Sequence, residues 1–133
     1  MGQQQLLLII LGVIIVGIAV AVALTLFNDN ASSSNRNAMT TDLLHLAAKA
    51  RHYYGRPTSM GGGGRSFTGL TIDKLVTDKF IDNANGLYSV DGVYGNDSVV
   101  FRGVGKVKNP DGSDIILTIT VLPQGPRNIL NVQ

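Results

Sequence analysis

An uninterrupted apolar stretch near the start dominates the pattern of this sequence. Leu6 to Phe27 reads LLLIILGVIIVGIAVAVALTLF, 22 residues without a charge and with Thr25 as the one polar side chain. As an α-helix this segment is about 33 Å long, close to the thickness of a bilayer's hydrocarbon core. A core helix of a water-soluble domain has a polar face, whereas this helix is apolar all round. The pattern therefore predicts a helix surrounded by lipid or by other copies of itself.

Small residues are concentrated in the second half of this stretch. Gly17 with Ala21, and Ala19 with Ala23, have the spacing at which small residues let two helix backbones approach closely. Because Ala is common in apolar helices, the spacing permits a helix–helix contact without requiring one.

The chain becomes polar at Asn28 and stays polar to Asn37. Ser, Asn and Asp are poor helix formers, so this segment could be a flexible linker. Alternatively, the helix continues through it with its polar surface in water. We favour the continuous helix, because no Pro or Gly lies between Gly17 and Gly55 and a helical pattern resumes directly afterwards.

Apolar residues then recur every three or four positions, which indicates an amphipathic helix that ends near Gly55 and Pro57. The other face carries Asp42, Lys49 and His52, so the apolar face alone needs a partner. The stripe that we expect to pack against a sheet consists of Met39, Leu43, Leu46, Ala47, Ala50 and Tyr53.

The composition of residues 57–66, with four consecutive glycines, predicts a loop. Thr71 can cap a short helix at about residues 72–81. Its apolar side would consist of Ile72, Leu75, Val76 and Phe80.

Beyond Gly86 the apolar period becomes strand-like. We predict antiparallel strands at about 87–90, 98–107 and 114–122. Their turns carry Gly, Asn, Asp and Pro, around Asp91-Gly92 or Tyr94–Asp97 and at Asn109–Gly112. Pro123 and Pro126 are expected to end the third strand, and residues 129–132 could add a short edge strand.

The predicted fold class is therefore α+β, a long N-terminal helix packed on a small antiparallel sheet. Its parts are an apolar helix at 1–27, a polar to amphipathic continuation at 28–55 and a small globular domain at 56–133.

Composition narrows the possible functions. Cys is absent, which excludes disulfides, thiolate metal sites and Cys nucleophiles. Glu is also absent, so all nine acids are Asp. The formal net charge is +2 and the cations are scattered along the sequence, so we do not expect nucleic-acid binding.

Candidate chemistry is sparse. His45 and His52 share a helix face, but their separation of two turns is too wide for one metal without other ligands. Asp111–Asp114 resembles a calcium loop only faintly and fits a hairpin turn. Gly61–Gly64 lacks the Gly-Lys-Ser/Thr of a phosphate loop. We therefore expect no enzymatic activity, no metal and no cofactor.

The architecture resembles that of type IV pilins and type II secretion pseudopilins. The resemblance rests on the apolar helix that starts within a few residues of Met1, on its amphipathic continuation Leu43–Tyr54 (LLHLAAKARHYY), and on the loop and small sheet that follow. Family members are cut by a prepilin peptidase after a Gly and usually have Glu at mature position five. Here that position is Gln5 if counting begins at Met1, or Leu7 if it begins after Gly2.

The resemblance implies the structural subunit of an extracellular type IV pilus-like filament. Such a subunit is anchored in the inner membrane before the assembly machinery packs its helix with copies of itself at the cell surface. Met1–Gln5 contains no Lys or Arg, so a basic leader would have been removed before Met1, or the leader would be only Met1-Gly2. Residues implied in processing or in contact with a neighbouring subunit are Met1, Gly2, Gln3 and Gln5. Residues implied in filament-core packing are Leu6, Leu7, Ile10, Ile14, Gly17, Ala21, Leu24 and Phe27.

Two other functions remain open, a pseudopilin of a secretion system and a single-span membrane-anchored extracytoplasmic domain that does not polymerise. Related pilins unwind locally within the apolar half of the helix in filaments, and here we would expect any such segment to begin near Gly17. We favour a continuous helix, because no Pro interrupts the apolar run.

Overall fold

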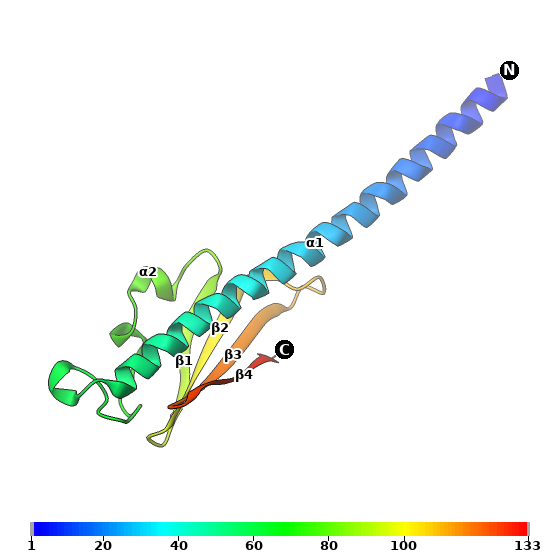
Figure 1. Ribbon diagram of the computed structural model, residues 1–133. Coiled ribbons are helices and arrows are strands. Elements are labelled where there is room, and N and C mark those ends of the chain that lie inside the picture. Colours follow the sequence, from blue (N-terminus) through cyan, green and yellow to red (C-terminus); the bar gives the residue numbers. More distant parts are fainter. Residues whose placement is uncertain (1, 133) are drawn as a thin grey trace.

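One continuous α-helix, α1 (Gly2–Gly55), forms the axis of the molecule and extends far beyond the rest of the chain (Figure 1). The computed structural model describes the backbone of residues 2–132 and the side chains of residues 2–124. The segment that could have been a linker, residues 28–37, is helical. In the single chain, the helix also runs without interruption through Gly12 and Gly17.

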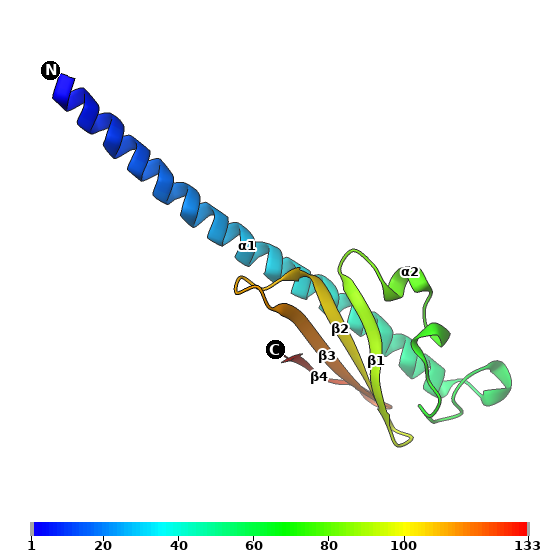
Figure 2. The same ribbon diagram turned by 180° about the vertical axis from the view of Figure 1, so that it is seen from behind.

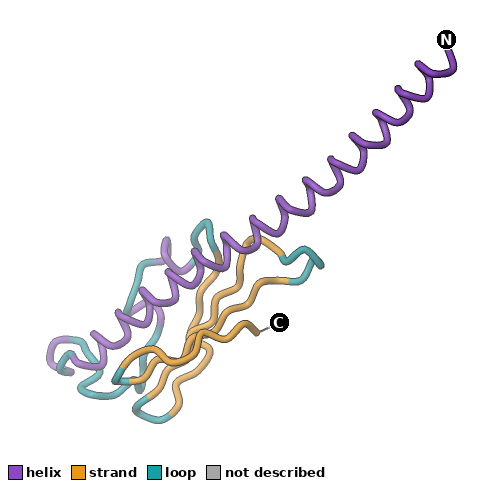
Figure 3. Tube along the Cα trace, turned by 45° about the vertical axis from the view of Figure 1, so that its right-hand side comes forward, coloured by secondary structure: helices purple, strands orange, loops and turns teal. Residues whose placement is uncertain are grey.

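Four strands form an antiparallel sheet in sequence order, β1 (Gly86–Tyr94), β2 (Ser98–Lys108), β3 (Asp114–Leu122) and β4 (Gly125–Val132). The second half of α1 lies across one face of this sheet (Figures 1 and 3). Seen from behind, no helix of the described chain covers the other face (Figure 2). The predicted α+β class is confirmed.

The core lies between α1 and the sheet. Because side chains alternate between the two faces of a strand, every second residue of β2 and β3 points towards the helix. Fully buried residues of the two layers include Met39, Leu43, Leu46 and Ala50 from α1, and Val99, Phe101, Ile115, Ile119 and Val121 from β2 and β3.

Two glycines of β2 let the helix approach the sheet closely. A Cβ atom on Gly105 would lie 2.5 Å from Oδ1 of Asn35, and one on Gly103 would lie 2.9 Å from the ring of Tyr88. Met39 passes over both positions, 3.0 Å from the Cβ site of Gly105 and 3.2 Å from that of Gly103. Any side chain at Gly103 or Gly105 would therefore push α1 away from the sheet.

The glycine run at residues 61–64 caps the C-terminal end of α1. The N–H groups of Gly63 and Gly64 donate to the carbonyl oxygens of Tyr53 (2.9 Å) and Arg56 (3.0 Å), and that of Arg65 donates to Tyr54 (2.8 Å). The bonds to Tyr53 and Tyr54 occupy carbonyls that a helix end leaves free. The run therefore terminates the helix, and these N–H groups are not available to a phosphate.

The helix predicted at 72–81 is wrong as a single element. The structure has a 3₁₀ turn, η2 (Ile72–Lys74), and a short helix, α2 (Asp78–Ile81), with extended backbone at Thr77 between them. Thr71 precedes η2 at the expected capping position but makes no side-chain capping bond. Two separate turns are enough to pack the apolar side chains of this segment against the core, so a single helix is not needed. These side chains are Ile72, Leu75, Val76 and Phe80.

Of the two turns predicted between the first two strands, the one at Tyr94–Asp97 forms, at residues 95–97, where Gly95 has a φ of 62°. Asp91-Gly92 instead forms a bulge inside β1. The third strand ends at Leu122, as predicted, but Pro126 lies within the next strand, β4, where it pairs with Val121. A proline is tolerated there because β4 is an edge strand, whose outer side needs no N–H donor.

Candidate functional site

The apolar half of α1 touches no other part of the described chain. Its large side chains from Leu6 to Phe27 are each 52–72% exposed, and a Cβ atom on Gly12 or Gly17 would meet nothing within 4 Å. By length and composition, this is the one described helix able to cross a membrane.

All residues of this half that were predicted to pack in a filament core are exposed in the single chain. The apolar stripe that was predicted to pack on the sheet is buried or partly buried. Gly2, Gln3 and Gln5 lie exposed in its first turns, and Met1 falls outside the described residues. Thr25 donates its hydroxyl to the carbonyl oxygen of Ala21 at 3.1 Å. The one polar side chain of the segment is thus satisfied within the helix, as an apolar environment requires.

Exposure of this surface to water is energetically prohibitive. Each large apolar side chain gains roughly 1.5–3 kcal/mol on burial, so the segment as a whole gains tens of kcal/mol when it leaves water. No element of the described chain provides that burial, so another molecule must.

A polar junction fixes α1 to the sheet shortly after the apolar half ends. Ser32 and Asn35 are only 5% and 7% exposed. Asn35 Nδ2 donates to the carbonyl oxygen of Asn85 at 2.8 Å, and Arg36 donates to Oδ1 of Asn109 at 2.6 Å. These contacts could not be predicted from the sequence, because Ser and Asn side chains in a helix are usually solvated.

A second polar contact ties the middle of α1 to the start of β1. Oδ2 of Asp42 accepts hydrogen bonds from the hydroxyl of Tyr88 (2.6 Å) and from the side-chain amides of Asn85 (2.9 Å) and Asn83 (3.0 Å). We call these four residues the Asp42 cluster. Asp42 was predicted to lie on the solvent face of the helix, whereas its carboxylate is half-buried by the loop that precedes β1.

The cluster shifts two pKa values in opposite directions. Burial alone would raise the pKa of Asp42, but hydrogen bonds from Asn85, Tyr88 and Asn83, with the electrostatic influence of His45, hold it below its usual value. Burial, followed by the bond to Asp42 and its negative charge, raises the pKa of Tyr88 far above its usual value. Folding therefore favours an ionised Asp42 beside a protonated Tyr88.

We expect the free energy of unfolding to depend on pH at both extremes. The folded-state pKa of Tyr88 is raised, so its contribution is complete below about pH 10, the unfolded-state value, and is lost as the pH rises further. The folded-state pKa of Asp42 is lowered, so its contribution is complete above about pH 4 and is lost as the pH falls further. Urea denaturation at a series of pH values measures both.

Matched variants test which residue causes each part of this pH dependence, the loss of stability at alkaline pH (the alkaline limb) and the loss at acid pH (the acid limb). Tyr88→Phe should remove much of the alkaline limb, whereas Tyr94→Phe, at an exposed ring, should leave it unchanged. Asp42→Asn should flatten the acid limb more than Asp73→Asn, a change at an exposed carboxyl. An alkaline limb as steep in Tyr88→Phe as in the parent chain would refute the role of the cluster.

The two histidines have separate environments. His45 stacks on Phe80 with 5.3 Å between ring centroids, and Nδ1 of His52 lies 3.3 Å from the guanidinium of Arg56. Among the described residues, no group of three or more His, Asp or Glu side chains is placed to hold a metal ion.

The Asp111–Asp114 segment forms a hairpin turn. Asp111 accepts hydrogen bonds from the backbone N–H and the hydroxyl of Ser113, and Asp114 pairs with Lys108. The Ser113 bonds lower the pKa of Asp111.

Comparisons of this chain with protein-family models, curated proteins and solved structures found no match.

Proposed function

We propose that this protein is the structural subunit of an extracellular, type IV pilin-like filament that polymerises through the apolar half of α1. The observation that carries the proposal is the continuous helix Gly2–Gly55, whose first half is exposed and apolar while its second half is fixed to the sheet. Before assembly the same apolar half would anchor the chain in the membrane.

The rigid connection favours a filament over a simple anchor. A helical polymer requires every subunit to hold its domain in the same position relative to its rod, because all interfaces repeat. The contacts of Ser32, Asn35 and Arg36 support such a fixed position, because they attach the sheet domain to α1 within a few residues of Phe27. A membrane anchor has no such requirement, and a flexible linker would serve it equally well.

One observation favours the non-polymerising anchor as a second candidate. Between Gly2 and Asn28 the chain has no carboxylate, so no acid of this segment can pair with the terminal amine of a neighbouring subunit. Assembly of this chain would therefore depend on apolar packing, with Gln3 and Gln5 able to hydrogen-bond an amine but not to neutralise it.

Gly17→Ile, compared with the parent chain, tests whether the chain polymerises through helices that pack closely at Gly17. A larger side chain at Gly17 meets nothing in the single chain and raises both helix propensity and apolarity, so membrane insertion should persist. In a filament it would separate helices that pack closely at Gly17 and Ala21, so we expect filament yield to fall about tenfold or more. Electron microscopy of sheared surface material and membrane fractionation measure the two effects.

The matched control is Val22→Ile, which enlarges a side chain that is already large. It should leave both filaments and insertion unchanged. Normal filament yield from Gly17→Ile would count against close packing at this position, and absence of filaments from the parent chain would favour the anchor.

A further inference from the structure

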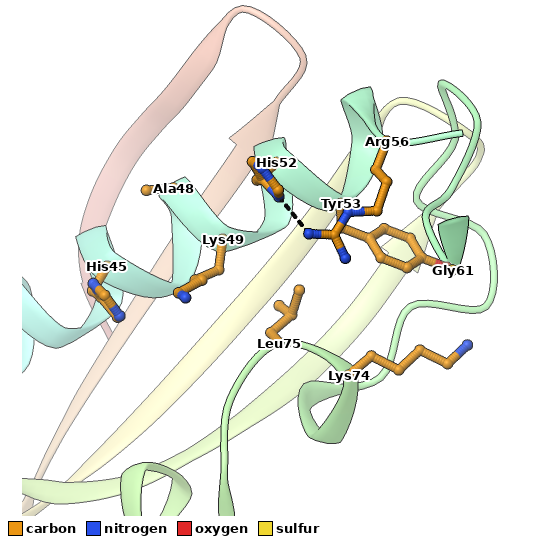
Figure 4. A pocket seen from close by; sticks show the side chains of 9 residues that line it. All are labelled: His45, Ala48, Lys49, His52, Tyr53, Arg56, Gly61, Lys74 and Leu75. Atoms are coloured by element: carbon orange, nitrogen blue, oxygen red, sulfur yellow. Dashed lines mark hydrogen bonds between the residues drawn. The ribbon is translucent and has the colours of Figure 1, made fainter. Parts of the chain in front are cut away.

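An open groove lies at the end of α1 remote from the apolar half (Figure 4). It encloses about 470 Å³ and is bordered by the last turns of α1, by Gly61 and by the segment around Lys74 and Leu75. Its basic lining residues are His45, Lys49, His52, Arg56 and Lys74, and no carboxylate lines it.

Helical spacing brings three of these residues together. Positions 45, 49 and 52 are separated by four and three residues, so they follow one face of α1, and Arg56 comes directly after its last residue, Gly55. The fold adds Lys74 from the opposite wall, where its ammonium donates to the carbonyl oxygen of Gly69 at 2.9 Å and lies 6.0 Å from the ring of Tyr53. Three cations that are scattered in the sequence, Lys49, Arg56 and Lys74, thus border one groove together with two imidazoles.

No basic residue of the groove forms an ion pair within the described chain. Its two ion pairs, Lys106–Asp82 and Lys108–Asp114, involve no groove residue. A guanidinium can only donate, so the contact between Arg56 and Nδ1 of His52 requires that nitrogen to be an acceptor. This contact holds the guanidinium over the groove (Figure 4).

The shape of the groove indicates which anion it suits. Cations spread along an open groove match a linear ligand with repeated charges better than one compact ion. Single-stranded nucleic acid is normally held by exposed aromatic rings on which bases stack. The ring that lines this groove, Tyr53, is partly buried. We therefore infer that the groove binds a linear anionic glycan that carries sulfate or carboxylate groups.

The position of the groove argues against lipid headgroups as the source of the anion. Phe27 and His52 are 25 residues apart on one continuous helix, which is about 37 Å. This distance is several times the Debye length of about 8 Å at physiological ionic strength. The cations of the groove are therefore screened from the headgroups of a membrane that holds the apolar half. The inference does not rest on filament formation, because it concerns the far end of a single chain.

Calorimetric titration of the full chain in non-ionic detergent with a heparin octasaccharide tests this inference. We expect Lys49→Gln/Arg56→Gln to weaken binding about five- to tenfold, since each exposed charge contact strengthens binding by up to about fivefold. The control, Arg51→Gln/Lys79→Gln, makes the same change in net charge at exposed positions outside the groove, and should alter the Kd less than about twofold.

Three outcomes would overturn the inference, provided that the melting temperatures show both variants to be folded. The first is that the parent chain does not bind the octasaccharide measurably. The second is that the two double variants lose equal affinity for it. The third is that a single-stranded oligonucleotide of equal charge binds as tightly as the glycan. An equal loss would mean that net charge alone attracts the probe.

Discussion

Ile15→Asp is expected to abolish filaments. Ile15 lies near the middle of the apolar half of α1, where every neighbour in a membrane or in a filament core would be apolar. A carboxylate at the centre of a membrane helix costs about 2.5–3.5 kcal/mol on insertion scales, and in a polymer the same penalty recurs in every subunit. The measurement is electron microscopy of sheared surface material from cells that express the variant.

The sheet domain should not respond to this change, because Ile15 contacts nothing in it. Its melting curve should therefore match that of the parent chain. Ser34→Asp introduces the same charge at an exposed position of the same helix and should assemble normally. Normal filaments from Ile15→Asp would show that the apolar half is not the filament core.

Leu43→Ala should produce the largest loss of domain stability among the variants considered. Leu43 is fully buried between α1 and the sheet. Removal of a buried leucine side chain leaves a cavity and lowers the free energy of unfolding by about 3–5 kcal/mol. Small domains have only about 5–15 kcal/mol in total, so the melting temperature should fall by roughly 12 °C or more. Near-ultraviolet circular dichroism can follow the transition through the buried ring of Tyr88.

The next residue provides the control. Leu44 belongs to the same helix but is 43% exposed, so Leu44→Ala should cost less than about 1 kcal/mol. Equal losses from the two variants would contradict the packing of α1 on the sheet through this stripe.

The helix and the sheet could be predicted because their periods are strong and local. Met39, Leu43, Leu46 and Ala50 repeat at helical spacing, and all four are fully buried. The strand beginning at Asp114 alternates cleanly, and its predicted bounds agree with β3. The absence of helix breakers between Gly17 and Gly55 correctly predicted that the helix continues through the polar segment.

The features that could not be predicted depend on contacts between distant parts of the chain. Asn35 is buried because Gly105 leaves space for its side chain and because Asn85, fifty residues later, accepts its hydrogen bond. Likewise, Asp42 accepts a hydrogen bond from the hydroxyl of Tyr88, a residue 46 positions later in the chain. No local pattern of residues indicates such pairs.

The groove was missed for a related reason. The spacing places His45 and His52 on one helix face, and Lys49 with His52 opposite the apolar stripe, but it does not indicate that Arg56 and Lys74 lie beside them. Lys74 reaches the same groove through the 3₁₀ turn η2, where a single helix had been predicted. The helical period of the sequence therefore could not predict that Lys74 borders the groove.

The central claim is that copies of this chain polymerise through the apolar half of α1. Its most direct test is negative-stain electron microscopy of sheared surface material, with mass spectrometry of the N-terminus of the protein in any filaments. The proposal predicts thin filaments composed of this chain. If the chain is found only as a monomer in the membrane of cells that possess a pilus assembly machinery, the claim is contradicted.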